Sequence, residues 1–100
     1  MADVFAALGH PTRMRVMTEC GRAARSTSQL QRSCAPISLP GMRKHLQVLE
    51  DAGLLRRTKV GRTVWCSAVP GSTNAAADYL LRLQSFWTDQ LDSLANSLEK

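Results

Sequence analysis

The sequence predicts a mainly α-helical fold with a small β-hairpin (an α+β class), in the order α-α-α-α-β-β-α. Apolar residues recur at helical spacing through most of the chain, and only the segment around Gly61 changes to a β-branched, strand-like pattern. The chain has 100 residues, 44% hydrophobic and 21% charged, which suits one folded domain over residues 1–100.

Turn and capping residues divide the first part of the chain into three helices. A short helix over residues 3–8 ends at Gly9. Pro11 suits the first turn of a second helix, where a missing N–H costs nothing. Ser26 is followed three residues later by Gln29, the pattern of a capping box, so we expect a short third helix to begin there.

The fourth predicted helix has two different faces. Ser38 caps its start and Gly53 ends it. At 100° per residue, its apolar side chains fall within an arc of about 80°, and a mostly polar set lies opposite in a similar arc. The apolar face is Leu39, Met42, Leu46 and Leu49, and the opposite face is Pro40, Arg43, Lys44 and Gln47. Such a helix can pack firmly on one side and offer hydrogen-bond donors on the other.

Two segments follow this helix. Residues 54–69 predict a hairpin whose tight turn lies at Gly61 and whose cations are Arg56, Arg57, Lys59 and Arg62.

A long helix is then predicted from about Thr73 to Leu98. Its apolar residues form a narrow stripe, typical of a helix–helix seam. The stripe is Ala76, Leu80, Leu83, Trp87, Leu91, Leu94 and Leu98, and the opposite face carries Asp78, Arg82, Asp89 and Asp92.

The charge distribution indicates a polyanionic partner for one part of the chain. The net charge is +5, but residues 1–63 carry +7 and residues 64–100 carry −2. A short helix, a turn and a helix with an exposed donor face form a helix-turn-helix, whose second helix enters the DNA major groove. The basic hairpin beside it predicts the wing of a winged helix.

Each residue type in this region suits a particular DNA contact. Arg43 and Lys44 can donate to phosphates or guanine, and Gln47 can pair with adenine. Ser38 suits a phosphate, whereas Leu39 and Pro40 suit a thymine methyl group. Arg57, Lys59 and Arg62 would follow the DNA backbone. For His45, between the two faces of its helix, a phosphate contact and a packing role both remain open.

Two motifs carry a resemblance to a known family. The stretches "ALGHPTRMRVM" and "ISLPGMRKHLQVLEDAGLLRRTKVGRTVW" resemble the ArsR/SmtB family of bacterial winged-helix transcription regulators. The resemblance implies a homodimeric repressor that binds a two-fold operator in double-stranded DNA and releases it on sensing a ligand. It also implies a dimer interface between the first and last helices. The residues that would form it are Val4, Phe5, Leu80, Leu83, Trp87, Leu91 and Leu94. Arg43, Gly41 and His10 depart from the family pattern, which leaves the operator sequence open, and Gly41 would weaken its helix by roughly 0.5–1 kcal/mol if it lay in the helix interior.

The sensing residues of the family are not evident here. Its metal sensors use a CxC pair on the third helix or Asp, His and Glu on the last, and neither pattern occurs, so we expect no metal and no cofactor. We expect structural roles for Cys20, Cys34 and Cys66, of which Cys20 falls at an apolar position of its helix, and a thiol-based sensor of arsenite, persulfide or oxidant remains an alternative. Cys34 lies close to Arg32 in the sequence and is the candidate reactive thiol.

Other classes of function have less support in the sequence. The two His are far apart and there is no glycine-rich phosphate loop or GxSxG motif, so we do not expect an enzyme. A winged helix that binds another protein remains a second alternative. There is no signal peptide and no apolar run of about 18 residues, so we expect a cytoplasmic protein without a membrane partner. For Arg13 we expect a structural role, such as an ion pair with Glu19 or another acid, rather than contact with DNA.

Overall fold

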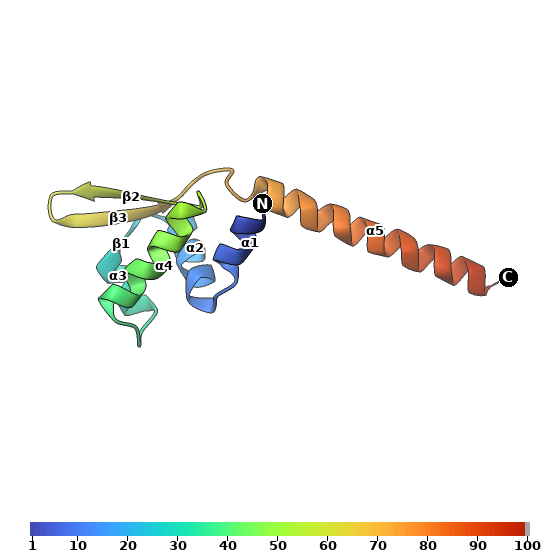
Figure 1. Cartoon of the computed structure of the whole chain (residues 1–100), viewed down its shortest axis with the longest axis horizontal. Coiled ribbons are helices and arrows are strands. Elements are labelled where there is room, and N and C mark those ends of the chain that lie inside the picture. The colour runs from blue at the N-terminus through green and yellow to red at the C-terminus, as the bar shows by residue number, and fades with distance from the viewer. Residues whose placement is uncertain (100) are drawn as a thin grey trace.

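The computed structural model describes residues 1–99 of the chain. The elements are α1 (Ala2–Leu8), α2 (Pro11–Arg22), β1 (Arg25–Ser26), α3 (Thr27–Ser33), α4 (Leu39–Asp51), β2 (Leu55–Val60), β3 (Thr63–Ala68) and α5 (Asn74–Leu98). The first four helices and the sheet form a compact body, and α5 projects away from it as a single long helix (Figure 1). The predicted mainly helical winged helix-turn-helix is confirmed.

Side-chain caps fix the starts of three helices. At α2, His10 Nδ1 accepts a hydrogen bond from the backbone N–H of Thr12 at 3.1 Å. At α3, the capping box of Ser26 and Gln29 forms in both directions, as predicted. At α4, Ser38 Oγ accepts from the third residue of the helix at 3.0 Å. These short-range signals explain why the helix starts can be located from the sequence.

The end of α4 turns the chain directly into the hairpin. Gly53 has a φ of +77°, a left-handed conformation that glycine adopts without strain. Its N–H donates to Glu50 O at 2.9 Å, and the N–H of Leu54 donates to Leu49 O at 3.0 Å. This pair of bonds is a Schellman motif, and it brings β2 back alongside α4.

The sheet contains one strand more than the sequence predicted. The strand order is β1-β3-β2, with both pairs antiparallel, and in β1 Arg25 pairs with Cys66 and Ser26 with Trp65. Two residues are too short to show an alternating pattern, and Ser26 was assigned only as a helix cap. The predicted order α-α-α-α-β-β-α is therefore corrected by this strand between α2 and α3.

The core lies between α2, α3, α4 and the base of the hairpin. Its fully buried side chains are Val16, Leu30, Met42, Leu46, Leu49, Leu54 and Cys66. Three of the four residues on the predicted apolar face of α4 are among them. The fourth, Leu39, is only half-buried because it lies in the first turn, at a groove between α3 and the hairpin.

Helix α5 leaves the body after its first turns. Ala76 is buried, and the rings of Tyr79 and Phe5 pack edge to face with their centroids 5.9 Å apart. The projecting helix gives the molecule dimensions of 69 × 27 × 21 Å. None of the helices in residues 1–99 has the length and apolar character needed to span a membrane.

Candidate nucleic-acid interface

Helix α4 presents the predicted recognition face to solvent. Pro40, Arg43, Lys44 and Gln47 are exposed, while the opposite face of the helix is packed in the core. Because the packed face fixes the helix axis, the exposed donors are carried on a rigid frame. A frame of this kind is what contacts to base edges require.

The first turn of α4 depends on the absence of a side chain at Gly41. A Cβ there would lie 3.1 Å from Ser38 Oγ and 3.2 Å from Ile37 Cγ1. Glycine therefore allows the capping serine and the isoleucine to close over the helix start. Gly41 is the third residue of α4, so it does not carry the cost of a glycine in a helix interior.

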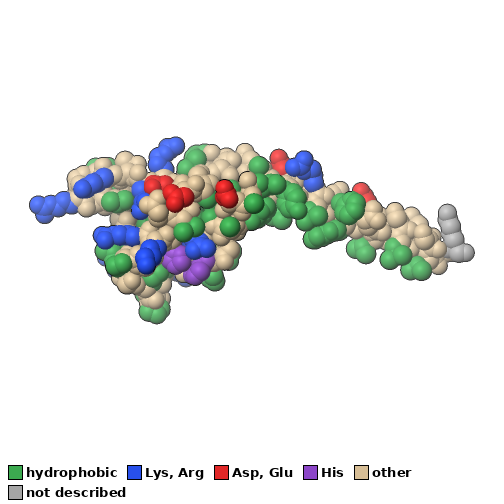
Figure 2. Space-filling view, viewed as in Figure 1, with side chains coloured by type: hydrophobic (Ala, Val, Ile, Leu, Met, Phe, Trp, Pro, Cys, Tyr) green, Lys and Arg blue, Asp and Glu red, His purple; other side chains and the backbone are tan. Residues whose placement is uncertain are grey.

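The β2–β3 hairpin, hereafter the wing, carries cations away from the body. Gly61, with a φ of +63°, and Arg62 form the two-residue turn between the paired ends of the strands. Arg56, Lys59 and Arg62 are exposed. Lys and Arg side chains gather over the end of the molecule that carries the wing and α4 (Figure 2).

A polar groove of about 290 Å³ lies between α3, α4 and the wing. Arg43 and Arg62, two predicted contact residues from different elements, both line it. The complete lining is Ser26, Thr27, Ser28, Leu39, Arg43, Arg62, Thr63 and Val64. Guanidinium and hydroxyl groups together are common phosphate donors. The hydroxyls of Thr27, Ser28 and Thr63 were not among the predicted contacts, although the serine and threonine run at the start of α3 was visible in the sequence.

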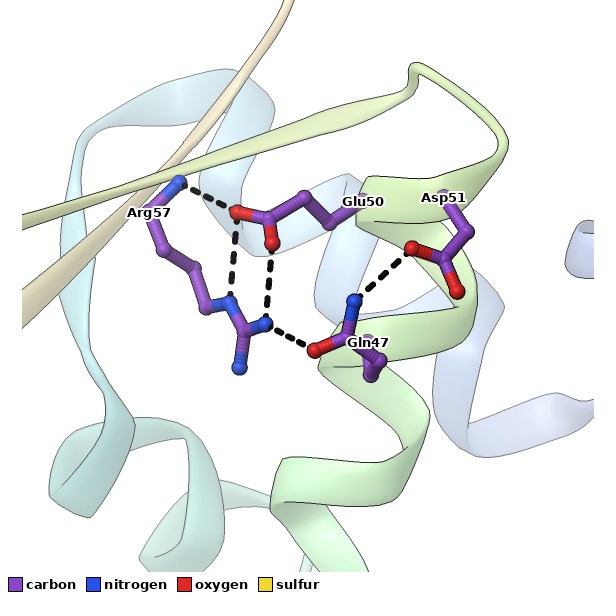
Figure 3. A network of polar contacts seen from close by, with 4 residues as sticks. All are labelled: Gln47, Glu50, Asp51 and Arg57. Carbon is purple, nitrogen blue, oxygen red and sulfur yellow. Dashed lines mark hydrogen bonds and ion pairs between the residues drawn. The ribbon is translucent and has the colours of Figure 1, made fainter.

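Arg57 differs from the other wing cations because it is directed at α4 (Figure 3). Its Nη2 lies 2.9 Å from Glu50 Oε1 and also donates to Gln47 Oε1 at 2.5 Å. The Gln47 amide in turn donates to Asp51 Oδ1 at 2.8 Å. The hydrogen bond from Arg57 holds the pKa of Glu50 below its usual range and raises the pKa of Arg57. Two residues predicted to face DNA thus contact each other in the free chain.

His45 packs toward α2 rather than standing clear of the surface. Its Nδ1 accepts a hydrogen bond from Arg13 Nη1 at 3.1 Å, and its ring centroid lies 4.4 Å from that of His10. Burial lowers the pKa of His45, and the charges of His10 and Arg13 lower it further. Arg13 also donates to the carbonyl of Ala7, so it has the expected structural role but not the expected acidic partner. Its expected partner, Glu19, accepts instead from the hydroxyl of Ser33.

The three thiols are shielded to different degrees. Cys20 and Cys66 are buried and Cys34 is half-buried. Burial raises the pKa of Cys34, the negative charge of Glu19 raises it further, and Arg15 lowers it. The cation acting on Cys34 is thus Arg15 and not Arg32, and the net shift disfavours the thiolate. Burial also raises the pKa of Cys66, and that of Cys20 to about 12.

A metal site is not formed by the side chains described. Within residues 1–99, no group of three or more His, Cys, Asp or Glu side chains is arranged to hold a metal ion.

The projecting part of α5 presents a second surface. Most of its predicted apolar stripe is exposed: Leu80, Trp87, Leu91, Leu94 and Leu98. Leu83 is half-buried. Large side chains of this kind on one stripe are unusual for a surface that faces water alone.

Comparisons with known proteins identify the family. The family model for a helix-turn-helix domain matches residues 8–58, from the end of α1 into β2. An ArsR-like transcriptional regulator from Rhodococcus sp. RHA1 is 38% identical, with a TM-score of 0.73 over 93% of this chain and 87% of that one. The chain belongs to the ArsR family of transcriptional regulators.

Two further solved structures agree with this assignment. An ArsR family transcriptional regulator is 31% identical, with a TM-score of 0.78 over 87% of this chain and 89% of that chain. A possible transcriptional regulator for arsenical resistance is 28% identical, with a TM-score of 0.71 over 95% of both chains. A search of curated proteins gave no match. ArsR family members are DNA-binding regulators rather than enzymes, and the matched residues 8–58 contain the helix-turn-helix of α3 and α4.

Proposed function

We propose that this ArsR family member is a homodimeric repressor that binds a two-fold operator in double-stranded DNA and releases it in response to a signal. The observation that carries the proposal is the exposed donor face of α4 beside a basic wing, opposite a face whose Met42, Leu46 and Leu49 are fully buried. A cytoplasmic location, where the DNA of a bacterial cell lies, is part of the proposal.

The side chains proposed to contact DNA differ in whether they already have hydrogen-bond partners within the protein. Arg43 and Lys44 are exposed on α4, and we assign them to base edges or to the nearest phosphates. Lys59 and Arg62 are exposed on the wing and are assigned to the DNA backbone. The remaining proposed contacts are Ser38, which caps α4, and Leu39, Pro40, His45 and Gln47 on α4 itself. His45 has a protein partner in the free chain, so contact with DNA would require it to exchange that partner. The Gln47 amide also has protein partners, but it keeps one N–H and one acceptor lone pair for a base.

The proposed dimer places α5 of each copy against α1 and α5 of the other. The exposed stripe on α5 supports this arrangement, because a second copy would remove those side chains from water. Val4 and Phe5 on α1 are half-buried in the free chain, and Phe5 packs beside Tyr79 near the base of the stripe. A two-fold dimer would place two recognition helices about 34 Å apart, one turn of DNA.

The signal that releases the DNA is not assigned to a residue. The thiol-based alternative receives less support, because the pKa values of Cys20, Cys34 and Cys66 are all raised and thiolates are the reactive form. We expect the effector to act at another surface.

Selection from a random DNA pool tests the proposal without knowledge of the operator. The wild-type protein would be used to enrich duplexes of about 30 base pairs, long enough for two half-sites one turn apart. The expected product is a motif with two-fold symmetry. Binding to it should weaken with salt at a log–log slope near −7 if the dimer contacts roughly eight phosphates. A pool that enriches no motif, with weak binding and little salt dependence, would support a protein-binding winged helix instead.

A further inference from the structure

Arg57 is the wing cation whose side chain turns back to the body of the protein. Its side chain is 22% exposed, whereas those of Arg56, Lys59 and Arg62 are largely open to solvent. Residues alternate between the two faces of a strand, so Arg57 lies on the same face of β2 as the buried Leu55. Its position on the strand therefore directs it toward α4 and away from the outer surface of the wing.

One carboxylate receives three hydrogen bonds from this residue. The backbone N–H of Arg57 donates to Glu50 Oε2 at 3.2 Å, Nε donates to the same oxygen at 3.3 Å, and Nη2 donates to Oε1 at 2.9 Å. The strand order β1-β3-β2 makes β2 an edge strand, whose outward N–H groups have no neighbouring strand. Glu50 thus holds the main chain of the wing as well as the guanidinium, in a bidentate geometry.

The same guanidinium orients the Gln47 amide. Arg57 Nη2 donates to Gln47 Oε1, and Gln47 Nε2 donates to Asp51 Oδ1, so both ends of the amide have partners (Figure 3). The carbonyl oxygen faces the wing and the NH₂ group faces the end of α4. An orientation fixed before DNA binds is the preorganisation that a base-reading side chain needs.

The wing requires a brace of this kind. Its outer strand, β2, is mostly exposed beyond Leu55. Opposite Arg57 the sheet still has three strands, because Arg25 of β1 pairs with Cys66 of β3. Only beyond Thr58 does the wing become a two-stranded ribbon, which is marginally stable by itself. Arg57 is two residues further out than Leu55, and its contact with Glu50 joins the wing to the recognition helix outside the core. Loss of that contact would leave the edge strand β2 without support just before the two-stranded part of the wing begins.

We propose that Arg57 is a positioning residue that fixes the wing against α4 through Glu50, and that the sequence discrimination of the DNA-binding surface depends on this contact. The proposal rests on the DNA-binding function proposed above. It replaces the prediction that Arg57 contacts the DNA backbone. Lys59 and Arg62 keep that role, and we add the exposed Arg56 to it.

The substitution Glu50→Ala distinguishes a phosphate contact by Arg57 from a positioning role, because the two roles predict different changes in DNA affinity. If Arg57 contacts phosphate, Glu50→Ala frees the guanidinium, and binding to every DNA becomes tighter. If Arg57 positions the wing, Glu50→Ala lowers the ratio of affinities for the selected duplex and a scrambled duplex by about tenfold, a coupling of the size seen between contacting residues. The ratio cancels the general effect of a changed net charge on DNA affinity.

Further variants complete the DNA-binding test. Arg57→Ala should lower the ratio as much as Glu50→Ala does, and the double variant should be no worse than either single one. The exchanged pair Glu50→Arg with Arg57→Glu should recover part of the ratio. Arg56→Ala is the matched control, because this neighbour is exposed on the other face of β2. It should weaken binding to both duplexes equally and reduce the salt slope by about 1.

A measurement without DNA tests the contact itself. In Glu50→Ala, the amide of Arg57 should lose protection from hydrogen exchange, and relaxation of ¹⁵N nuclei should show increased motion at the wing tip, Gly61 and Arg62. Thermal melting of each variant identifies a purely structural role, which would lower the melting temperature and leave the affinity ratio of the folded protein unchanged. That outcome, or an equally rigid wing in Glu50→Ala, would overturn the proposal. If random-pool selection enriched no motif, the function proposed above would fail, and the role in sequence discrimination with it, whereas the relaxation data would still decide whether Glu50 braces the wing.

Discussion

Substitution of Leu91 by Asp should dissociate the proposed dimer. Leu91 is 66% exposed in the single chain, and it lies within the apolar stripe of α5, between Trp87 and Leu94. Burial of a leucine side chain contributes about 1.5–3 kcal/mol. A two-fold interface contains two copies, so their loss removes about 3–6 kcal/mol. The dimer dissociation constant should therefore rise roughly a hundredfold to ten-thousandfold. The cost of burying two carboxylates would add to this.

The assay is sedimentation equilibrium over a range of protein concentrations. Leu81→Asp is the matched control, because Leu81 is 63% exposed on the same helix but lies beside the polar face rather than on the stripe. We expect the Leu81 variant to remain dimeric at concentrations where the Leu91 variant is monomeric. Both should keep the helical circular dichroism of the wild type, because neither side chain belongs to the core. A Leu91 variant as dimeric as the wild type, or equal dissociation of both variants, would refute the stripe as the interface.

Three further predictions concern DNA contact, pH and thiol reactivity. Arg43→Ala should weaken binding to the selected duplex by about 1–3 kcal/mol if Arg43 contacts a base, and an equal loss on scrambled DNA would instead indicate a phosphate contact. The pKa of His45 is lowered from 6.5, so the unfolded chain takes up the proton first as pH falls. The free energy of unfolding should thus be insensitive to His45 above about pH 6.5 and decrease below it. His45→Gln should remove that decrease, and an unchanged pH profile in urea unfolding would contradict the assignment. Cys34 should react with iodoacetamide more slowly than free cysteine at neutral pH, because its pKa is raised, and fast labelling followed by mass spectrometry would contradict this.

The helices could be predicted because their signals are local. The capping residues Ser26 and Ser38 act within three residues of themselves, and the left-handed Gly53 ends α4 through bonds within one turn. The apolar periodicity of α4 and α5 is equally local, and it located both the packed face and the exposed stripe. The long helix begins at Asn74, one residue after the predicted start.

The parts that could not be predicted depend on contacts between distant segments. Strand β1 exists because Arg25 meets Cys66, a partner that no pattern within two residues can reveal. The sequence placed Arg57 in the wing with the other cations, but whether it faces DNA or α4 depends on the path of β2 beside Glu50. Cys34 was judged from its sequence neighbour Arg32, whereas Glu19 and Arg15 of α2 are the charges that act on it in the fold.

The residues that line the polar groove could not be predicted for the same reason. Thr63 on the wing joins the hydroxyls of Thr27 and Ser28 only because the hairpin lies beside α3. The sequence identifies which residues of this surface are cations, while the tertiary structure decides which of them have no partner within the described residues. For the free ones, Arg43, Lys44, Lys59 and Arg62, the assignment to DNA stays a prediction.

The most direct test of the central claim is a fluorescence anisotropy titration of the wild-type protein. The selected duplex and a scrambled duplex of the same composition would be compared at one stated salt concentration. We expect the selected duplex to bind tighter than the scrambled one by a factor of about a thousand or more, the range of sequence-specific regulators. Equal, weak binding to both duplexes would contradict it, and would indicate a basic winged helix whose partner is not a specific DNA sequence.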